Sequence, residues 1–140
     1  MLYQLIYSSQ SSRPMTAADL EEILSDARAG NEARNITGVL VYVDGVFLQI
    51  IEGEREAVIG LMKSIASDTR HSGVTIFHEA EVEERTFASW RMAHLSASPQ
   101  QMAAWAGLPG TTTLESVLRD LSQKERAARV ASNLLQALAP

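Results

Sequence analysis

Residues 36–53 read ITGVLVYVDGVFLQIIEG, and this stretch decides the fold. Two runs rich in β-branched and aromatic residues flank the pair Asp44-Gly45. An Asp-Gly pair between such runs is the strongest short-range signal of a β-hairpin. The stretch therefore predicts two antiparallel strands joined by a tight turn.

The sequence on both sides of this hairpin predicts a mixture of strands and helices. The residues before it alternate as a strand does and then continue into a helical pattern that begins with a capping-box-like Thr16. The residues after it give an apolar helical stripe and two further β-rich runs. The predicted elements are strands over 2–8, 74–82 and about 89–95, and helices over 16–30 and 54–67.

The order of these elements is strand, helix, strand, strand, helix, strand, with one more strand at the end. This order is typical of an α+β ferredoxin-like sandwich. We expect a five-stranded mixed sheet with both helices on one face. The first and third strands are neighbours in this topology, so Tyr7 and Gln49 should lie on adjacent strands beneath the helices.

A boundary is predicted at Ser98-Pro99, where a Ser N-cap with Pro at the first helical position begins a short helix that ends at Gly107. We therefore divide the chain into a domain over 1–97 and a C-terminal helical extension over 98–140. A longer amphipathic segment starts at Thr113, and its centre, SQKERAAR, is polar enough to break it into two helices.

The extension has an apolar stripe, and the predicted sheet has an uncovered face. With both helices on one side, Ile6, Val46, Leu48 and Ile50 would form an exposed patch too large for a soluble monomer. We expect the extension to pack on this second face, and a dimer or partner interface is the alternative. Its stripe consists of Leu114, Val117, Leu118, Leu121, Ala128, Ala131, Leu134, Leu135 and Leu138.

Composition disfavours several classes of function. The chain has 140 residues, a formal net charge of −5 and no cysteine. The acidic charge disfavours nucleic acid as a partner, and the lack of cysteine excludes thiolate chemistry and favours the cytoplasm. No apolar run approaches the roughly 20 residues of a membrane span. His78 and His94 lack partners at metal-ligand spacing, and no catalytic sequence motif is present, so neither a metal site nor an enzyme is predicted.

Gln49 is unusual because it stands inside an apolar strand, FLQII, whose two faces both look buried. A buried primary amide must find hydrogen-bond partners, since leaving it unpaired costs roughly 1–3 kcal/mol. A structural bond to a loop backbone would satisfy it, and so would a ligand. Tyr7 on the neighbouring strand carries a hydroxyl that could donate into the same pocket.

Other polar residues have both a structural and a functional explanation. Asn31 follows Gly30, where a helix C-terminal turn accounts for both residues. Arg70 and His71 close the second helix, where positive charge suits the helix dipole, and they could equally bind a phosphate. Trp90 and Met92 are predicted to share one face of the last strand as core residues, with Arg91 on the other face.

Five motifs in this order and spacing resemble the BLUF family of blue-light sensors over residues 1 to about 95. Any one of them is weak alone, but five in register across a whole domain are specific. The length and the helical tail resemble a short member of the family. The motifs are LIYSS at 5–9, NITGVLVY at 35–42, DGVFLQIIEG at 44–53, DTRHSGV at 68–74 and FASWRM at 87–92.

The resemblance implies a flavin, FAD with FMN as the alternative, between the two helices. It implies that Tyr7 is the electron and proton donor, that Gln49 is the switching amide, and that Trp90 and Met92 are the pair that exchanges position beside it. The flavin contacts that it implies are Tyr7, Ile23, Ala27, Asn31, Leu40, Phe47, Gln49, Ile65, Asp68, Arg70 and His71. The neighbours Gly30 and Glu32 depart from the family pattern, which puts an auxiliary ring contact in doubt.

The function that this resemblance implies is light sensing without a substrate, with a signal passed through the last strand and the extension to a downstream protein partner in trans. A homodimer is left open. Two alternatives remain from the residues alone: a ferredoxin-like module that binds another small molecule without photochemistry, and a flavin-dependent oxidoreductase. The second lacks a dinucleotide fingerprint.

Overall fold

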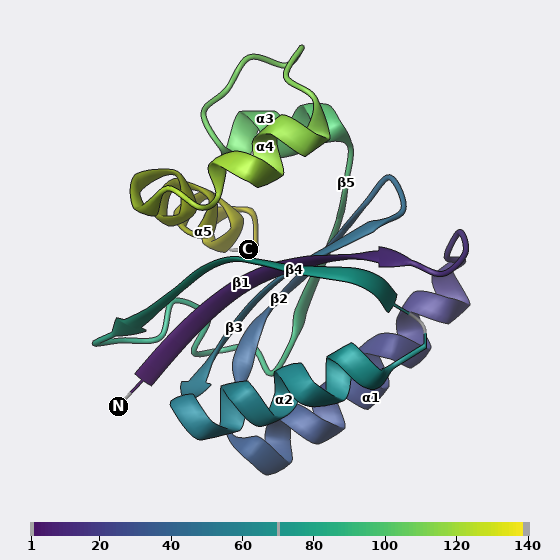
Figure 1. The fold of residues 1–140 in the computed structure, drawn as a ribbon, viewed down its shortest axis with the longest axis vertical. Helices are drawn as coiled ribbons and strands as arrows, with labels where there is room; N and C mark the ends of the chain where they lie inside the picture. The colour runs from purple at the N-terminus through teal and green to yellow at the C-terminus, as the bar shows by residue number, and fades with distance from the viewer. Residues whose placement is uncertain (1, 70, 139–140) are drawn as a thin grey trace.

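The computed structural model describes residues 2–69 and 71–138, with His71 described by its backbone only (Figure 1). The predicted order of elements is confirmed, and the extension does break into separate helices. The elements are β1 (Leu2–Ser11), α1 (Ala17–Arg34), β2 (Thr37–Val43), β3 (Val46–Glu54), α2 (Arg55–Ser67), β4 (His71–Val82), β5 (Ala93–Ala97), α3 (Pro99–Trp105), α4 (Leu114–Asp120) and α5 (Lys124–Leu138).

The five strands form one mixed sheet in the order β4-β1-β3-β2-β5, which confirms the ferredoxin-like prediction. β5 pairs parallel with β2, and the other neighbours are antiparallel. The β2–β3 turn has positive φ at Asp44 (48°) and Gly45 (79°), as the predicted tight hairpin requires. In the β1–β3 register Tyr7 lies directly opposite Gln49.

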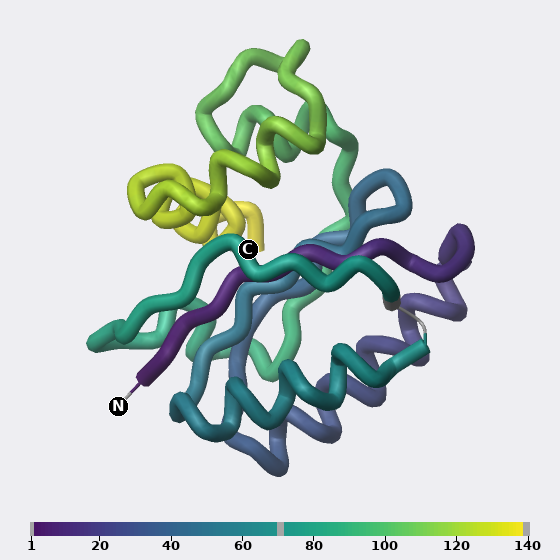
Figure 2. The backbone as a smooth tube through the Cα atoms, viewed as in Figure 1, coloured from purple at the N-terminus to yellow at the C-terminus, as the bar shows by residue number. Residues whose placement is uncertain are grey.

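Each face of the sheet is covered by a different set of helices (Figure 1). α1 and α2 cover the face that carries Leu5, Tyr7 and Ile51, and we call this side the helix side. The backbone leaves β5, turns through α3 and α4, and returns with α5 to cover the other face, which we call the extension side (Figure 2).

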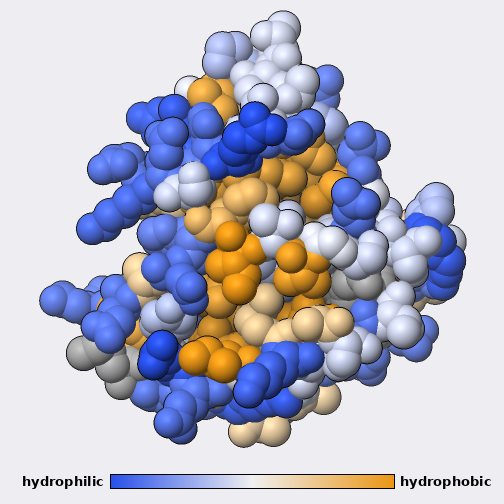
Figure 3. Space-filling model, in the orientation of Figure 1, coloured by the Kyte–Doolittle hydropathy of each residue, from blue (hydrophilic) through white to orange (hydrophobic). Residues whose placement is uncertain are grey.

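The extension packs on the second face of the sheet, as its apolar stripe predicted. Ile6, Leu48 and Ile50 of the sheet are fully buried in one cluster with residues of all three extension helices. Among the described residues, the only exposed large hydrophobic side chains are Ile59 and Ile76. Figure 3 shows hydrophobic surface between the extension and α2. One member of the predicted stripe is wrong: Ala128 is exposed, because α5 turns Ala127 and Val130 inward instead.

The first helix does not end at Gly30, as predicted, but continues to Arg34. Asn35 is its C-cap, with a left-handed φ of 55° and a backbone N–H that donates to the carbonyl of Asn31. Gly30 therefore interrupts nothing, and the helix-ending Asn is four residues later than expected. The predicted start is confirmed, since Thr16 and Asp19 form a capping box.

The last strand begins later than predicted, at Ala93, so Trp90 and Met92 precede it. They do not share a face: Met92 is buried on the helix side, and Trp90 packs against the extension-side core. The loop before β5 is held by side chains instead of strand pairing. The buried carboxylate of Glu52 accepts the backbone N–H groups of Thr86 (2.7 Å) and Phe87 (2.8 Å). Strand alternation therefore does not apply to residues 90 and 92.

We expect Leu134→Ala to lower the free energy of unfolding by about 2–4 kcal/mol, because Leu134 is fully buried between α5 and the sheet. Leu138→Ala is the control, because that side chain is only partly buried at the end of the same helix. Urea unfolding of both variants measures the difference. Equal and small losses would show that the extension is not part of the cooperative core.

Candidate functional site

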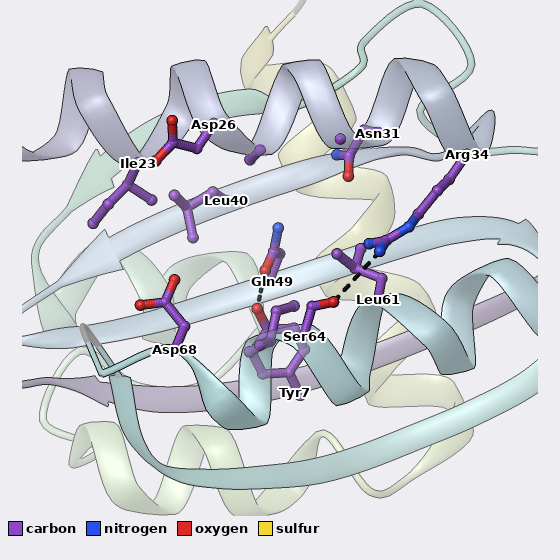
Figure 4. Close-up of a pocket in the computed structure, with 13 residues that line it drawn as sticks. Tyr7, Ile23, Asp26, Asn31, Arg34, Leu40, Gln49, Leu61, Ser64 and Asp68 are labelled. Atoms are coloured by element: carbon purple, nitrogen blue, oxygen red, sulfur yellow. Dashed lines mark hydrogen bonds between the residues drawn. The ribbon is translucent and has the colours of Figure 1, made fainter.

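A cavity lies on the helix side of the sheet, between α1 and α2 (Figure 4). It encloses about 200 Å³ and opens to solvent between the two helices. α1 presents one face to it, α2 and its C-terminal end present another, and β1, β2 and β3 form the floor. Its lining residues are Tyr7, Ile23, Asp26, Ala27, Gly30, Asn31, Arg34, Leu40, Gln49, Leu61, Ser64, Ile65 and Asp68.

Tyr7 and Gln49 are joined by a hydrogen bond at the floor of the cavity. The Tyr7 hydroxyl donates to Oε1 of Gln49, and the other end of the same amide, Nε2, donates to the sulfur of Met92 at 3.3 Å. Tyr7 is fully buried and Gln49 nearly so. The partners that a buried amide requires are thus a hydroxyl and a thioether, and not the loop backbone of the structural explanation.

The Tyr7 hydroxyl is held in its neutral form. Burial is the main cause that raises the pKa of Tyr7, and the negative charge of Asp68 raises it further. A raised pKa favours the protonated phenol over the phenolate. Tyr7 therefore remains a hydrogen-bond donor at ordinary pH.

Asn31 is buried in the last turn of α1, where its carbonyl accepts the N–H of the C-cap Asn35, so the left-handed position that ends the helix is Asn35 and not Asn31. Its Nδ2 donates to the backbone carbonyl of Arg91 at 2.6 Å. The residue also lines the cavity, where Figure 4 shows its side chain directed from α1 toward the floor. One amide thus connects the cavity with the loop that precedes β5.

The walls of the cavity are apolar and its rim is polar. Ile23 on α1 and Ile65 on α2 face the space from opposite sides, as the resemblance implied. At the rim, Nη2 of Arg34 donates to the hydroxyl of Ser64 at 3.4 Å and so bridges the two helices. Asp26 and Asp68 also lie at the cavity.

Most of the site residues inferred from the sequence come together here. Eight of them line the cavity. Met92 does not line it, but its sulfur accepts a hydrogen bond from Gln49, which does. Phe47 and Trp90 do not line the cavity. The ring of Phe47 packs against that of Tyr42 with 5.2 Å between the ring centroids, and Trp90 lies on the extension side. Arg70 and the side chain of His71 lie outside the described residues. The eight are Tyr7, Ile23, Ala27, Asn31, Leu40, Gln49, Ile65 and Asp68.

Sequence reasoning missed five lining residues, and helical spacing could have found them. On α1 they lie three, seven and eleven positions after Ile23, which keeps them on one helix face. On α2 they lie four positions and one position before Ile65. The missed residues are Asp26, Gly30, Arg34, Leu61 and Ser64.

The lining fits a flavin. A flat aromatic ring needs apolar walls for its faces and hydrogen-bonding groups at its edge. Ile23 and Ile65 supply the walls, and the amides of Asn31 and Gln49 supply donors and acceptors. At Gly30 an added Cβ would meet nothing within 4 Å, so the α1 wall has open space beside these amides.

The described residues hold no group of three or more side chains that could bind a metal ion. Within the same part of the chain, no helix combines the length and apolar character that crossing a bilayer requires.

Comparison with known proteins defines the class. The model of the BLUF family, "Sensors of blue-light using FAD", matches residues 2–93, and the chain belongs to this family. Among curated proteins, it is 39% identical over 108 residues to the photoactivated adenylate cyclase subunit beta of Euglena gracilis, a match that covers 76% of this chain. That match spans only 12% of the cyclase subunit.

Solved structures of BLUF proteins are similar to this fold over nearly the whole chain. "BlrB - a BLUF protein, dark state structure" is 29% identical with a TM-score of 0.77, covering 98% of this chain and 97% of that one. "BlsA photo-activated state" is 28% identical with a TM-score of 0.81, covering 100% and 97%. A bacterial light-regulated adenylyl cyclase is 29% identical with a TM-score of 0.68, but only 41% of that chain is covered.

We expect Ala27→Phe to abolish or strongly weaken flavin binding, because the larger side chain would fill the space between the helices. Ala29→Phe is the matched control, since Ala29 is on the same helix but is exposed and does not line the cavity. Flavin fluorescence titration measures both affinities, with circular dichroism to confirm the fold. Equal flavin affinity in the two variants would place the flavin elsewhere.

Proposed function

We propose that this blue-light sensor holds its flavin in the cavity between α1 and α2 and that Tyr7 and Gln49 are its photochemical switch. The observation that supports this most directly is the buried chain of hydrogen bonds from Tyr7 through Gln49 to Met92 at the cavity floor. When bound, flavin supplies blue-light absorption and an acceptor for an electron. The match to the BLUF family model favours this function over a ferredoxin-like binding module without photochemistry.

The switch works through the two different ends of one amide. With flavin bound, Tyr7 would donate an electron to it, and the hydroxyl proton would follow through the hydrogen bond to Oε1 of Gln49 to the same acceptor. Both would return to Tyr7 after the amide has reversed, so no substrate is consumed. Reversal of the Gln49 amide then places Nε2 where Oε1 stood and turns Oε1 toward Met92. A thioether accepts hydrogen bonds but cannot donate one, so the reversed amide loses its bond to the sulfur. The buried network is thereby rewired with little backbone movement.

The output of this change is proposed to pass through the loop before β5 to the extension and then to a protein partner in trans. Met92 lies on the helix side, whereas Trp90 two residues earlier packs with the extension. A displacement of the segment from Trp90 to Met92 would therefore alter packing on both the helix side and the extension side. A homodimer is the alternative to a different partner, and the cytoplasm stays the compartment that the composition predicts.

FAD is the proposed cofactor, in keeping with the family to which the chain belongs, and FMN is the alternative. One similar structure is that of BlrP1 of Klebsiella pneumoniae with FMN and cyclic diGMP. Arg70 and His71 remain predictions for the phosphate side. Chromatography of the flavin released from purified protein distinguishes the two. The cyclase activity of the longer relatives is not carried over, and no catalysis is proposed for this chain.

We expect the wild-type chain with flavin to show a reversible red shift of its absorption under blue light, and Tyr7→Phe to abolish that shift while flavin stays bound. The substitution removes one hydroxyl and keeps the ring that fills the core. Absorption spectra before, during and after illumination test both statements. A normal photocycle in Tyr7→Phe would remove Tyr7 from the switch, and an unresponsive wild type would contradict the proposed function.

Gln49→Leu is expected to keep the flavin but to eliminate the red shift, because Leu has similar volume and no amide to reverse. Gln4→Leu is the control, since Gln4 is also a buried glutamine in the sheet but bonds to Glu52 on the other face. The same spectra compare the two. A red shift that persists in Gln49→Leu would exclude the amide switch.

A further inference from the structure

Arg28 is an exposed residue of α1 that reaches the loop before β5. Its Nε donates to the backbone carbonyl of Met92 at 3.1 Å. One turn later on the same helix, Asn31 donates to the carbonyl of Arg91 at 2.6 Å. α1 therefore holds two successive carbonyls, and Arg28 holds the one that belongs to Met92. Arg28 itself does not line the cavity.

Residues 91–92 lie just before the strand pairing of β5, and the Arg91 side chain donates to Oδ1 of Asn35 at 3.0 Å. The pairing of β5 with β2 starts only at Ala93, opposite Val39. Upstream, the loop is fixed by Glu52 at Thr86 and Phe87 and by the Gly38 N–H, which donates to the Trp90 carbonyl at 3.1 Å. Between these anchors and β5, the carbonyls of residues 91 and 92 accept their hydrogen bonds from α1.

The place of the Met92 backbone matters because its sulfur accepts the hydrogen bond from Gln49 at 3.3 Å. A hydrogen bond to sulfur is weak, and its strength falls quickly when the acceptor moves away. Met92 is almost fully buried, so the side chain follows its backbone with little freedom. Whatever holds the Met92 carbonyl thus also sets the distance from its sulfur to the Gln49 amide.

We propose that Arg28 is a positioning residue of the light switch, which holds Met92 against the Gln49 amide and so favours the amide orientation seen here. This inference rests on the proposed function of Tyr7 and Gln49. Return of the reversed amide in the dark re-forms the bond from Nε2 to the sulfur. Without the Arg28 bond this contact is looser, and the return becomes slower by about two- to fivefold, the factor expected for one weak hydrogen bond.

A matched pair of substitutions tests the hydrogen bond separately from the charge. In Arg28→Gln, the side-chain nitrogen Nε2 stands the same number of bonds from Cα as Nε of arginine, so a donor is kept. Arg28→Met has similar length and no donor. Both variants remove the charge that, with burial as the larger cause, lowers the pKa of His94. An effect through His94 would therefore be equal in the two.

We expect dark recovery of the full chain with FAD to slow in Arg28→Met and to stay near the wild-type rate in Arg28→Gln. Flavin affinity and thermal unfolding should be unchanged in both. Arg13→Met is a further control, because Arg13 pairs with Asp19 in the capping box of the same helix and touches neither loop nor cavity. Wild-type recovery in Arg28→Met, or equal slowing in all three variants, would overturn the proposal.

The double variant Arg28→Met/Met92→Leu tests whether Arg28 acts through Met92. If it does, Arg28→Met adds nothing to the recovery rate of Met92→Leu, whereas a further slowing would overturn the proposal. The methyl resonance of Met92 in ¹³C-methionine-labelled protein gives a second measurement that needs no photocycle. It should shift or broaden in Arg28→Met and not in Arg28→Gln, and an unchanged resonance in both would overturn the positioning role. An unresponsive wild type, in contrast, would contradict the proposed function itself.

Discussion

The pairing of β1 with β3 is the constraint on which the rest of the site depends. This antiparallel register places Tyr7 opposite Gln49, and directly opposed residues point to the same face of a sheet. Because that face is the one covered by α1 and α2, the hydroxyl and the amide meet under the helices, away from bulk solvent. A register slip of one residue would turn one of the two side chains toward the extension.

The same alternation gives the sheet two apolar faces, and the chain covers them with different elements. β3 shows this within a few residues, since Phe47, Gln49 and Ile51 lie on the helix side while Leu48 and Ile50 lie under the extension. The helix side keeps the cavity between α1 and α2. The extension side is filled by α3, α4 and α5, so Tyr7 and Gln49, the proposed switch, lie above a packed layer that can respond to a displacement in the sheet.

Sequence reasoning could predict the features that local chemistry determines. The Asp-Gly turn indicated the hairpin, the periodic stripes indicated the helices, and an apolar strand with one amide identified Gln49. It failed where tertiary contacts replaced a local rule. Gly30 suggested a helix end, but the packed helix continues to Arg34, and Asn35 is its C-cap. Trp90 and Met92 suggested strand alternation, but Glu52 of β3 binds the loop before them through the backbone N–H groups of Thr86 and Phe87. The roles of the site residues and the division at 97 and 98 remain predictions.

The loop between β4 and β5 has a firmly anchored first half and a more weakly held second half. Its first half is anchored by a buried carboxylate, Glu52, which also accepts Nε2 of Gln4 at 3.0 Å and is therefore expensive to displace. In its second half, the carbonyls of Arg91 and Met92 each accept one side-chain hydrogen bond from α1, and the Arg91 side chain donates to Oδ1 of Asn35 at 3.0 Å. A change at Gln49 should therefore move the second half and leave the first in place. Since β5 follows directly and leads into α3, the proposed signal would be directed toward the extension, where Trp90 already makes contact.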